Sequence, residues 1–309
     1  MSTQPFHDGE IAIQERAGER DIARQRGAMI GSRIVPGALP FLAQQRLIAV
    51  SIAGDAGYLW TSVWCGAPGF VHSADGQRVG ITASMIAPSS DDPVRPRAAV
   101  GRDIGMLAID FASRRRLRIN GTIEADAGEL VVLVRESAPN CPKYIQRRQS
   151  FEVSPPAAFA GTGRRGHMLD GDTRELVERA DTAFVGSLHP DRGVDTSHRG
   201  GSPGFIEVVG PTNLRVPDYP GNSLFMTLGN FAIDSRASLA VVDFERGRLL
   251  SLSGSAHVDF DADDPHQLTG GTRRFWDFAV REWIQFELPR DVGWALLDAS
   301  PFNPPQSPK

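Results

Sequence analysis

Short apolar runs separated by Gly, Pro, Asp and Ser recur along the chain and predict a protein built mostly of β-strands. In the first half these runs cover 48–52, 78–83, 106–111, 117–124 and 130–134, and in the second half 182–187, 204–209, 238–244 and 249–260. Many short strands with turn residues at close spacing are typical of a barrel or a sandwich. The apolar residues of 275–286 fit both the helical and the strand period, and their alternation and aromatic character favour a strand.

Helices are expected at four places only. Residues 9–27 are charged and rich in Ala, Glu and Arg, and residues 37–46 lie directly before the first strand. A third helix is predicted over 172–180. A fourth should begin at 139–142, with Asn140 as its N-cap and a proline in its first turn.

The two halves of the chain repeat one another. Residues 61–62 and 66–70 read Thr-Ser and Gly-Ala-Pro-Gly-Phe, and 196–197 and 201–205 read Thr-Ser and Gly-Ser-Pro-Gly-Phe, at a constant offset of 135. Further matches follow in the same order, which the chance recurrence of common strand and turn sequences would rarely produce. We therefore expect two copies of one β domain. The predicted division is 1–150 for the N-terminal helix and first copy, 151–169 for a Pro- and Gly-rich linker, and 170–309 for the second copy with an extended tail.

Composition narrows the classes of function. The 309 residues carry a net charge of -4, which argues against a bulk nucleic-acid binder. No run of 18 apolar residues is present, so no membrane span is predicted. The two cysteines, Cys65 and Cys141, are too few for a disulfide framework, and the polar first residues do not resemble a secretory signal, so a cytoplasmic location is expected. Only Lys143 and Lys309 are lysines, so an anionic ligand would have to be held mainly by arginines and backbone amides.

Two motif matches are false positives. Residues 161–166 fit the dinucleotide pattern G-x-G-x-x-G, but no strand is predicted before them. Residues 200–204 fit the nucleophile elbow G-x-S-x-G, but Pro203 has no N–H for the oxyanion hole. No metal-ligand spacing is found among the histidines and cysteines.

The most informative polar cluster is Ser197-His198-Arg199, followed by Gly200 and Gly201. A hydroxyl, an imidazole and a guanidinium beside glycines are the groups that bind a phosphate, because they offer charge-assisted donors and close backbone approach. The first copy has Ser62-Val63-Trp64-Cys65-Gly66 at the same place. The sequence therefore predicts a polar site in the second copy only, with a solvated turn as the alternative.

Other polar segments are less decisive. Residues 217–222 and 227–230 read as polar loops, for which ordinary turn chemistry is an equal explanation. The basic run 114–118 is expected to form a solvated face, with a phosphate or partner contact as the alternative. Cys141, although it is near Lys143, is expected to be a structural core residue.

These segments together resemble the pyridoxamine 5'-phosphate oxidase-like, FMN-binding split-barrel family, and within it the related flavin-nucleotide-binding proteins. The resemblance covers nearly the whole chain and rests on 180–187, 195–205, 216–222, 227–230, 249–254 and, in the first copy, 140–145. It implies split β-barrels that normally form a homodimer with FMN between the subunits. Two copies in one chain would then form a pseudo-dimer. A further homodimer is left open.

The resemblance also implies the ligand and the residues that hold it. The cofactor would be FMN, with FAD or a deazaflavin as alternatives. The implied cofactor-binding residues are Ser197, His198, Arg199, Asn222, Thr227 and Asn230. The family's oxidases also place lysine near the phosphates, whereas the second copy has no lysine before Lys309, and the pyridoxamine phosphate motif is not recognisable.

The function expected from this resemblance is a flavin-dependent oxidoreductase that acts on an unknown small molecule. An external reductase would supply electrons, and no catalytic residue is assigned. The alternatives are a non-catalytic flavin-nucleotide-binding or carrier protein and a cofactor-free scaffold.

Overall fold

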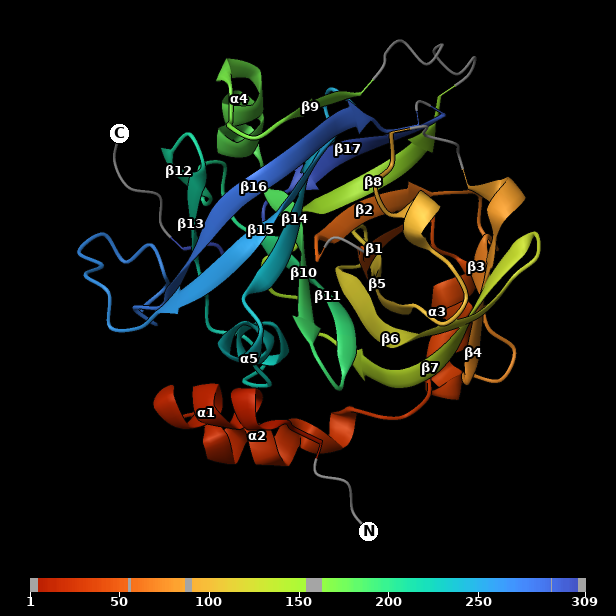
Figure 1. The fold of residues 1–309 in the computed structure, drawn as a ribbon, viewed down its shortest axis with the longest axis horizontal. Coiled ribbons are helices and arrows are strands. Elements are labelled where there is room, and N and C mark those ends of the chain that lie inside the picture. Colours follow the sequence, from red (N-terminus) through yellow and green to blue (C-terminus); the bar gives the residue numbers. More distant parts are fainter. Residues whose placement is uncertain (1–4, 55–56, 87–90, 154–162, 290, 305–309) are drawn as a thin grey trace.

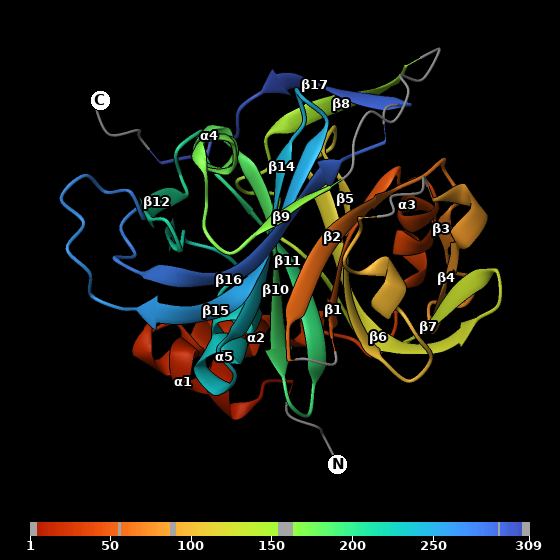
Figure 2. The same cartoon turned by 45° about the horizontal axis from the view of Figure 1, so that its top comes forward.

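The fold consists of two antiparallel sheets packed side by side (Figure 1), with a two-stranded ribbon that lies at the top of the view in Figure 2. It is known from a computed structural model that describes residues 5–54, 57–86, 91–153, 163–289 and 291–304. The strands of the first sheet are β1 (Leu47–Ala53), β2 (Leu59–Cys65), β3 (Val71–His72), β4 (Arg78–Thr82), β5 (Asp103–Asp110), β6 (Arg115–Asp126) and β7 (Glu129–Pro139). Those of the second are β10 (Thr182–His189), β11 (Gly193–Gly200), β12 (Glu207–Gly210), β13 (Asn213–Pro217), β14 (Arg236–Asp243), β15 (Arg248–Asp259) and β16 (Phe275–Glu287). The ribbon pairs β8 (Arg147–Glu152) with β17 (Val292–Asp298), and β9 (Arg164–Gly166) lies beside β16.

Both sheets have the same strand order. The first runs β2-β1-β5-β6-β7-β4-β3 and the second β11-β10-β14-β15-β16-β13-β12, so each strand has a counterpart in the other sheet. The predicted mainly β architecture of two tandem split barrels is confirmed. The segment 275–286 is a strand, as its alternation indicates, whereas the strand predicted over 204–209 begins only at Glu207.

The correspondence extends to single residues. A bulge interrupts the β6–β7 pairing at Asn120/Gly121 and the β15–β16 pairing at Ser253/Gly254. A Cβ on Gly121 would lie 2.2 Å from a backbone carbonyl oxygen, and one on Gly254 would lie 2.0 Å from another, so only glycine fits either bulge. The repeated Gly-x-Pro-Gly-Phe turns also match, because Gly69 and Gly204 have φ values of 94° and 89°. The predicted offset between the copies therefore holds in the structure.

The two barrels meet along a seam in which β11 packs against β5 and β6, and β2 against β14 and β15 (Figure 2). Buried hydroxyls join the barrels there. The Thr61 hydroxyl lies 2.7 Å from that of Ser51 and 2.6 Å from that of Ser238, and Thr196 donates to Ser51 over 2.7 Å. Gly186, on the other side of this cluster, has no room for a side chain, since a Cβ would lie 2.3 Å from the Ser238 hydroxyl.

The helices flank the sheets. They are α1 (Asp8–Arg16), α2 (Arg20–Arg26), α3 (Leu39–Ala43), α4 (Gly171–Arg179) and α5 (Met226–Ile233), with short 3-10 turns η1 (Gly27–Met29), η2 (Pro36–Ala38), η3 (Ala83–Met85) and η4 (Arg95–Arg97). Three of the four predicted helical segments are found. The N-terminal helices, which the sequence analysis grouped with the first copy, lie under α5 of the second (Figure 1). Gly9 of α1 and Gly229 of α5 allow this contact, because a Cβ on Gly9 would lie 2.3 Å from the Gly229 carbonyl oxygen.

Two local predictions are wrong. No helix begins at 139–142; β7 continues to Pro139 and an irregular segment follows, with Tyr144 at a φ of 66°. The C-terminal segment fixes this backbone, because the Tyr144 N–H donates to the Ser300 hydroxyl over 3.1 Å, and Gln146 accepts from the Ser300 N–H over 2.8 Å. Residues 227–230 are not a loop but part of α5.

Parts of two predicted segments lie outside the described residues. These are 154–162 of the linker, which includes the first two positions of the G-x-G-x-x-G match, and 305–309 of the tail. No helix within the described ranges is both long enough and apolar enough to cross a bilayer.

Candidate functional site

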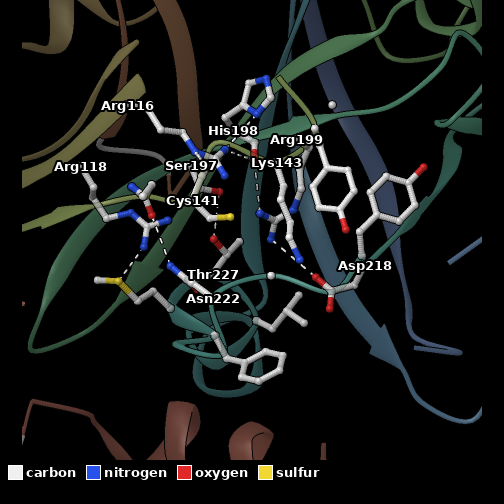
Figure 3. A pocket seen from close by; sticks show the side chains of 18 of the residues that line it. Arg116, Arg118, Cys141, Lys143, Ser197, His198, Arg199, Asp218, Asn222 and Thr227 are labelled. Carbon is white, nitrogen blue, oxygen red and sulfur yellow. Dashed lines mark hydrogen bonds and ion pairs between the residues drawn. The ribbon is translucent and has the colours of Figure 1, made fainter. Parts of the chain in front are cut away.

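A pocket opens at the seam and takes its walls from both barrels (Figure 3). The first barrel contributes β6 and the irregular segment after β7, and the second contributes β11 and the segment that leads into α5. The empty space, counted with the open solvent at its mouth, is about 810 Å³. The charged side chains of its lining are Arg116, Arg118, Lys143, Arg199 and Asp218.

Four of these five side chains are cationic, and two have no acidic partner. The Arg118 Nε lies 3.0 Å from an Asp195 carboxylate oxygen, and the nearest guanidinium nitrogen of Arg199 lies 4.0 Å from Asp218. Within the described part of the chain, neither Arg116 nor Lys143 forms an ion pair. The pocket therefore carries an uncompensated positive charge of about two, which favours an anion.

Arg116 contradicts the solvated face that the basic run 114–118 predicted. Its Nε donates to the Cys141 carbonyl oxygen over 2.9 Å, and its Nη1 lies 3.0 Å from His198 Nδ1. Burial and the neighbouring guanidiniums of Arg118 and Arg199 lower the pKa of Arg116. A like-charged cluster of this kind is stabilised when an anion enters it. Arg116 thus contacts the second barrel and lines the pocket, and the alternative of a phosphate or partner contact stays a prediction.

His198 is buried, with 3% of its surface exposed. Because burial and the nearby Arg116 and Arg199 hold the pKa of His198 well below its usual value, the ring is neutral. Its Nδ1 accepts from Arg116, so the proton is on Nε2, which has no partner among the described residues. His198 therefore offers a neutral N–H donor to the pocket.

This protonation state can be measured. We expect His198 to remain neutral, with its proton on Nε2, at pH 6.5, the usual pKa of histidine, because the surrounding arginines oppose a further positive charge. Imidazole 15N chemical shifts of a histidine-labelled sample would report both the charge and the tautomer. An imidazolium pattern for His198 at that pH would contradict the assignment.

The start of α5 faces the pocket with free donors. The Thr227 hydroxyl donates to that of Ser197 over 2.9 Å. The first helical hydrogen bond runs from Gly229 N to Phe225 O, so the amides of residues 226–228 have no protein acceptor in the described chain. Phe225 precedes them at a φ of 57° and provides no side-chain cap. Open amides at the positive end of a helix dipole bind anions.

Five of the six predicted cofactor-binding residues meet at this pocket. Ser197, His198, Arg199, Asn222 and Thr227 line it. Asn230 does not, because it lies one turn further along α5 and its amide group contacts residues outside the pocket. There it donates to the Ser187 hydroxyl over 2.9 Å and lies 3.0 Å from His7 Nε2.

Sequence reasoning missed the contribution of the first barrel. Lys143 supplies the lysine that the second copy lacks, and Cys141, which is only partly buried, lines the pocket where a core position was predicted. Tyr144 of the first barrel lies against Tyr219 of the second, with 4.8 Å between ring centroids. Cys141, Lys143 and Tyr144 lie more than 50 positions before the Ser-His-Arg cluster, so only the packing of one copy on the other reveals them.

The equivalent positions on the other side of the seam carry no charged side chains. By strand register, Leu249 and Ser251 replace Arg116 and Arg118, and Val63 and Trp64 replace His198 and Arg199. All four replacements are buried. We therefore expect one anion site per chain.

No family model matches the chain, and no curated protein matches it. Solved structures to which it is similar include HupZ of Group A Streptococcus, with 13% identity, a TM-score of 0.31, and coverage of 41% of this chain and 98% of that one. A Clostridium acetobutylicum protein related to general stress protein 26, of the pyridoxinephosphate oxidase family, has 14% identity and a TM-score of 0.27, covering 38% and 92%. The heme storage protein HutZ of Vibrio cholerae has 10% identity and a TM-score of 0.28, covering 38% and 94%. At such values no function is transferred from these proteins to this chain.

Proposed function

We propose that this protein binds FMN through its terminal phosphate, in the pocket between the barrels. The observation that carries the proposal is the unpaired charge of Arg116 and Lys143 next to the open amides of α5. A phosphomonoester carries a charge of about −1.5 to −2 at neutral pH and three acceptor oxygens, which matches both features.

The remaining lining residues support a ligand that is larger than phosphate. The Ser197–Thr227 hydroxyl pair and the His198 Nε2–H add neutral donors beside the cations. Tyr144 and Tyr219 form an aromatic wall at the same pocket, against which a planar ring could pack. FAD presents a pyrophosphate diester in place of a terminal phosphate, so it fits the charge of a single open helix terminus less well.

In this arrangement the flavin and the protein would have separate roles. The flavin, when bound, supplies the redox chemistry. The chain's own residues bind the phosphate, orient the ligand across the seam and hold the His198 proton on Nε2. No side chain of the described pocket has the features of a general base, so the proposal is a flavoprotein of the oxidoreductase type in which catalysis belongs to the cofactor.

The test compares FMN with riboflavin, FAD and a deazaflavin by titration of the purified protein, followed by its absorption spectrum. FMN should bind at one per chain, and riboflavin, which lacks the phosphate, about a hundredfold more weakly, because it forfeits the charge-assisted contacts. Equal affinity for FMN and riboflavin, or two sites per chain, would overturn the proposal. Reduction of the bound flavin by NAD(P)H or by a separate reductase would support an oxidoreductase, and stable unreacted flavin would support a carrier.

A further inference from the structure

The pocket between the barrels, lined by Arg116 and Lys143, is the anion pocket of the proposed function. A second, smaller cavity lies behind its wall. It is lined by His7, Glu10, Asn120, Glu136, Arg192, Gly193, Asp195, Met226 and Asn230. Its three carboxyl groups come from three elements, namely α1, β7 and β11. Met226, the first residue of α5, lines this cavity and the anion pocket alike, so the two spaces share a wall.

Arg118 connects the two spaces by charge. Its guanidinium lines the anion pocket while its Nε lies 3.0 Å from Asp195 Oδ1, at the cavity. Asn120 donates to the same oxygen over 3.0 Å and to Glu136 over 3.3 Å. A change in the charge of the cavity's carboxyl groups, Glu10, Glu136 and Asp195, therefore changes how far the positive charge of Arg118 is neutralised.

The cavity contains acceptors without donors. Asp195 Oδ2 and Asn120 Oδ1 have no hydrogen-bond partner in the described chain, and only 2% and 3% of these residues is exposed. Buried acceptors of this kind require a donor, which water or a protonated carboxyl provides. A metal is not favoured, because the described residues contain no group of three His, Cys, Asp or Glu side chains arranged to hold one.

Glu10 is the side chain best placed to hold a proton there. It is 3% exposed, and burial raises its pKa to about 8. Burial and the neighbouring Asp195 also raise the pKa of Glu136. The other titratable or charged groups around Glu10 are His7 from its own helix cap, Arg192 and Asp195 from the β10–β11 hairpin, and His189, whose ring lies 4.2 Å from that of His7. The residues that α5 presents to Glu10 and this cavity in the described chain, Met226, Gly229 and Asn230, are uncharged.

We propose that this acidic cavity is a proton-binding site coupled to the anion pocket, so that binding of a dianion takes up a proton at Glu10 and loss of that proton weakens anion binding. The proposal rests on the proposed phosphate binding and adds its regulation. The sign follows from charge: an anion beside Arg118 favours the neutral carboxyl, and by reciprocity the neutral carboxyl favours the anion. Affinity should be highest below pH 8 and decrease as Glu10 ionises.

The test uses sulfate, which stays a dianion from pH 6 to 9, and FMN. In wild type we expect affinity for both to decrease about three- to tenfold from pH 7 to pH 9, the effect of one partly screened charge. Calorimetry in two buffers of different ionisation enthalpy should show proton uptake near pH 8. Glu10→Gln, which mimics the protonated side chain, should keep the high affinity at pH 9 and abolish the uptake.

Two controls make the outcome decisive. Glu15→Gln changes an exposed glutamate of the same helix and should behave as wild type. Glu136→Gln should reduce the pH dependence only in part if Glu10 holds the proton. Binding of both anions with an unchanged pH dependence in Glu10→Gln would overturn the coupling and leave the proposed function intact. Absence of anion binding at every pH would instead reject the proposed function.

Discussion

Replacing Arg116 by alanine should weaken FMN binding about ten- to hundredfold. Among the described residues, Arg116 is one of two pocket cations without a carboxylate partner, so its charge is available to a ligand. Loss of a charge-assisted contact costs about 1.5–3 kcal/mol, which gives that range of affinity. Arg199, which shares Asp218 with Arg274, should matter less, because part of its charge is already neutralised. Fluorescence titration of the purified variants with FMN measures both effects.

The neighbouring residue provides the control for Arg116. Arg115 is exposed and its guanidinium lies 4.9 Å from the ring centroid of Phe41, away from the pocket. Arg115→Ala removes the same charge from the chain, so it should leave affinity unchanged within twofold at moderate salt. Equal losses in the two variants would mean that only net charge matters and that the pocket is misassigned.

Replacing Gly200 by alanine should both destabilise the protein and abolish tight ligand binding. A Cβ there would lie 2.1 Å from the carbonyl oxygen of Tyr144, so β11 and the irregular wall from the first barrel would have to separate. Overpacking of this kind costs about 1–3 kcal/mol in unfolding free energy, and here it also displaces Lys143 and Tyr144. Urea unfolding and FMN titration of one sample measure the two effects.

Gly221 offers the matched control, since it lines the same pocket and its nearest neighbour to an added Cβ lies 3.8 Å away. Gly221→Ala should therefore preserve stability and binding. If Gly200→Ala were as stable as this variant, the close contact between the barrels at Tyr144 would be wrong.

The architecture was predictable because the repeat preserves residues with backbone roles. Gly66 and Gly201 start equivalent turns, and glycine is required at both bulges, so equal spacing in sequence means equal geometry. The helix α5 was not predictable. It has eight residues with Gly229 in its interior, and it depends on the packing of α1 rather than on propensity. The helix expected at Asn140 failed because Ser300, far away in sequence, holds that backbone instead.

The candidate site was predictable only on one side of the seam. Ser197, His198 and Arg199 form a recognisable local cluster, whereas Arg116 and Lys143 are indistinguishable in sequence from surface residues. Their role arises when β6 and the segment after β7 pack against β11. The prediction of one polar loop over 227–230 was also misleading, because these residues belong to a helix, which turns the side chains of Thr227 and Asn230 to different faces.

The hydroxyl cluster at the seam requires different residues in the two halves, so each half fits the other half and not a second copy of itself. The first half has Ser51 and Gly105 where the second has Gly186 and Ser238, and in neither case would the larger residue fit at the glycine. A Cβ at Gly186 would lie 2.8 Å from the Ser51 hydroxyl, and one at Gly105 would lie 2.7 Å from the Asp195 backbone. In an assembly of two identical subunits, every substitution appears twice about the axis. Here one side of the seam can carry buried, uncharged residues such as Leu249 and Trp64 while the other carries the charged residues of the proposed site, so the two sides can be selected independently.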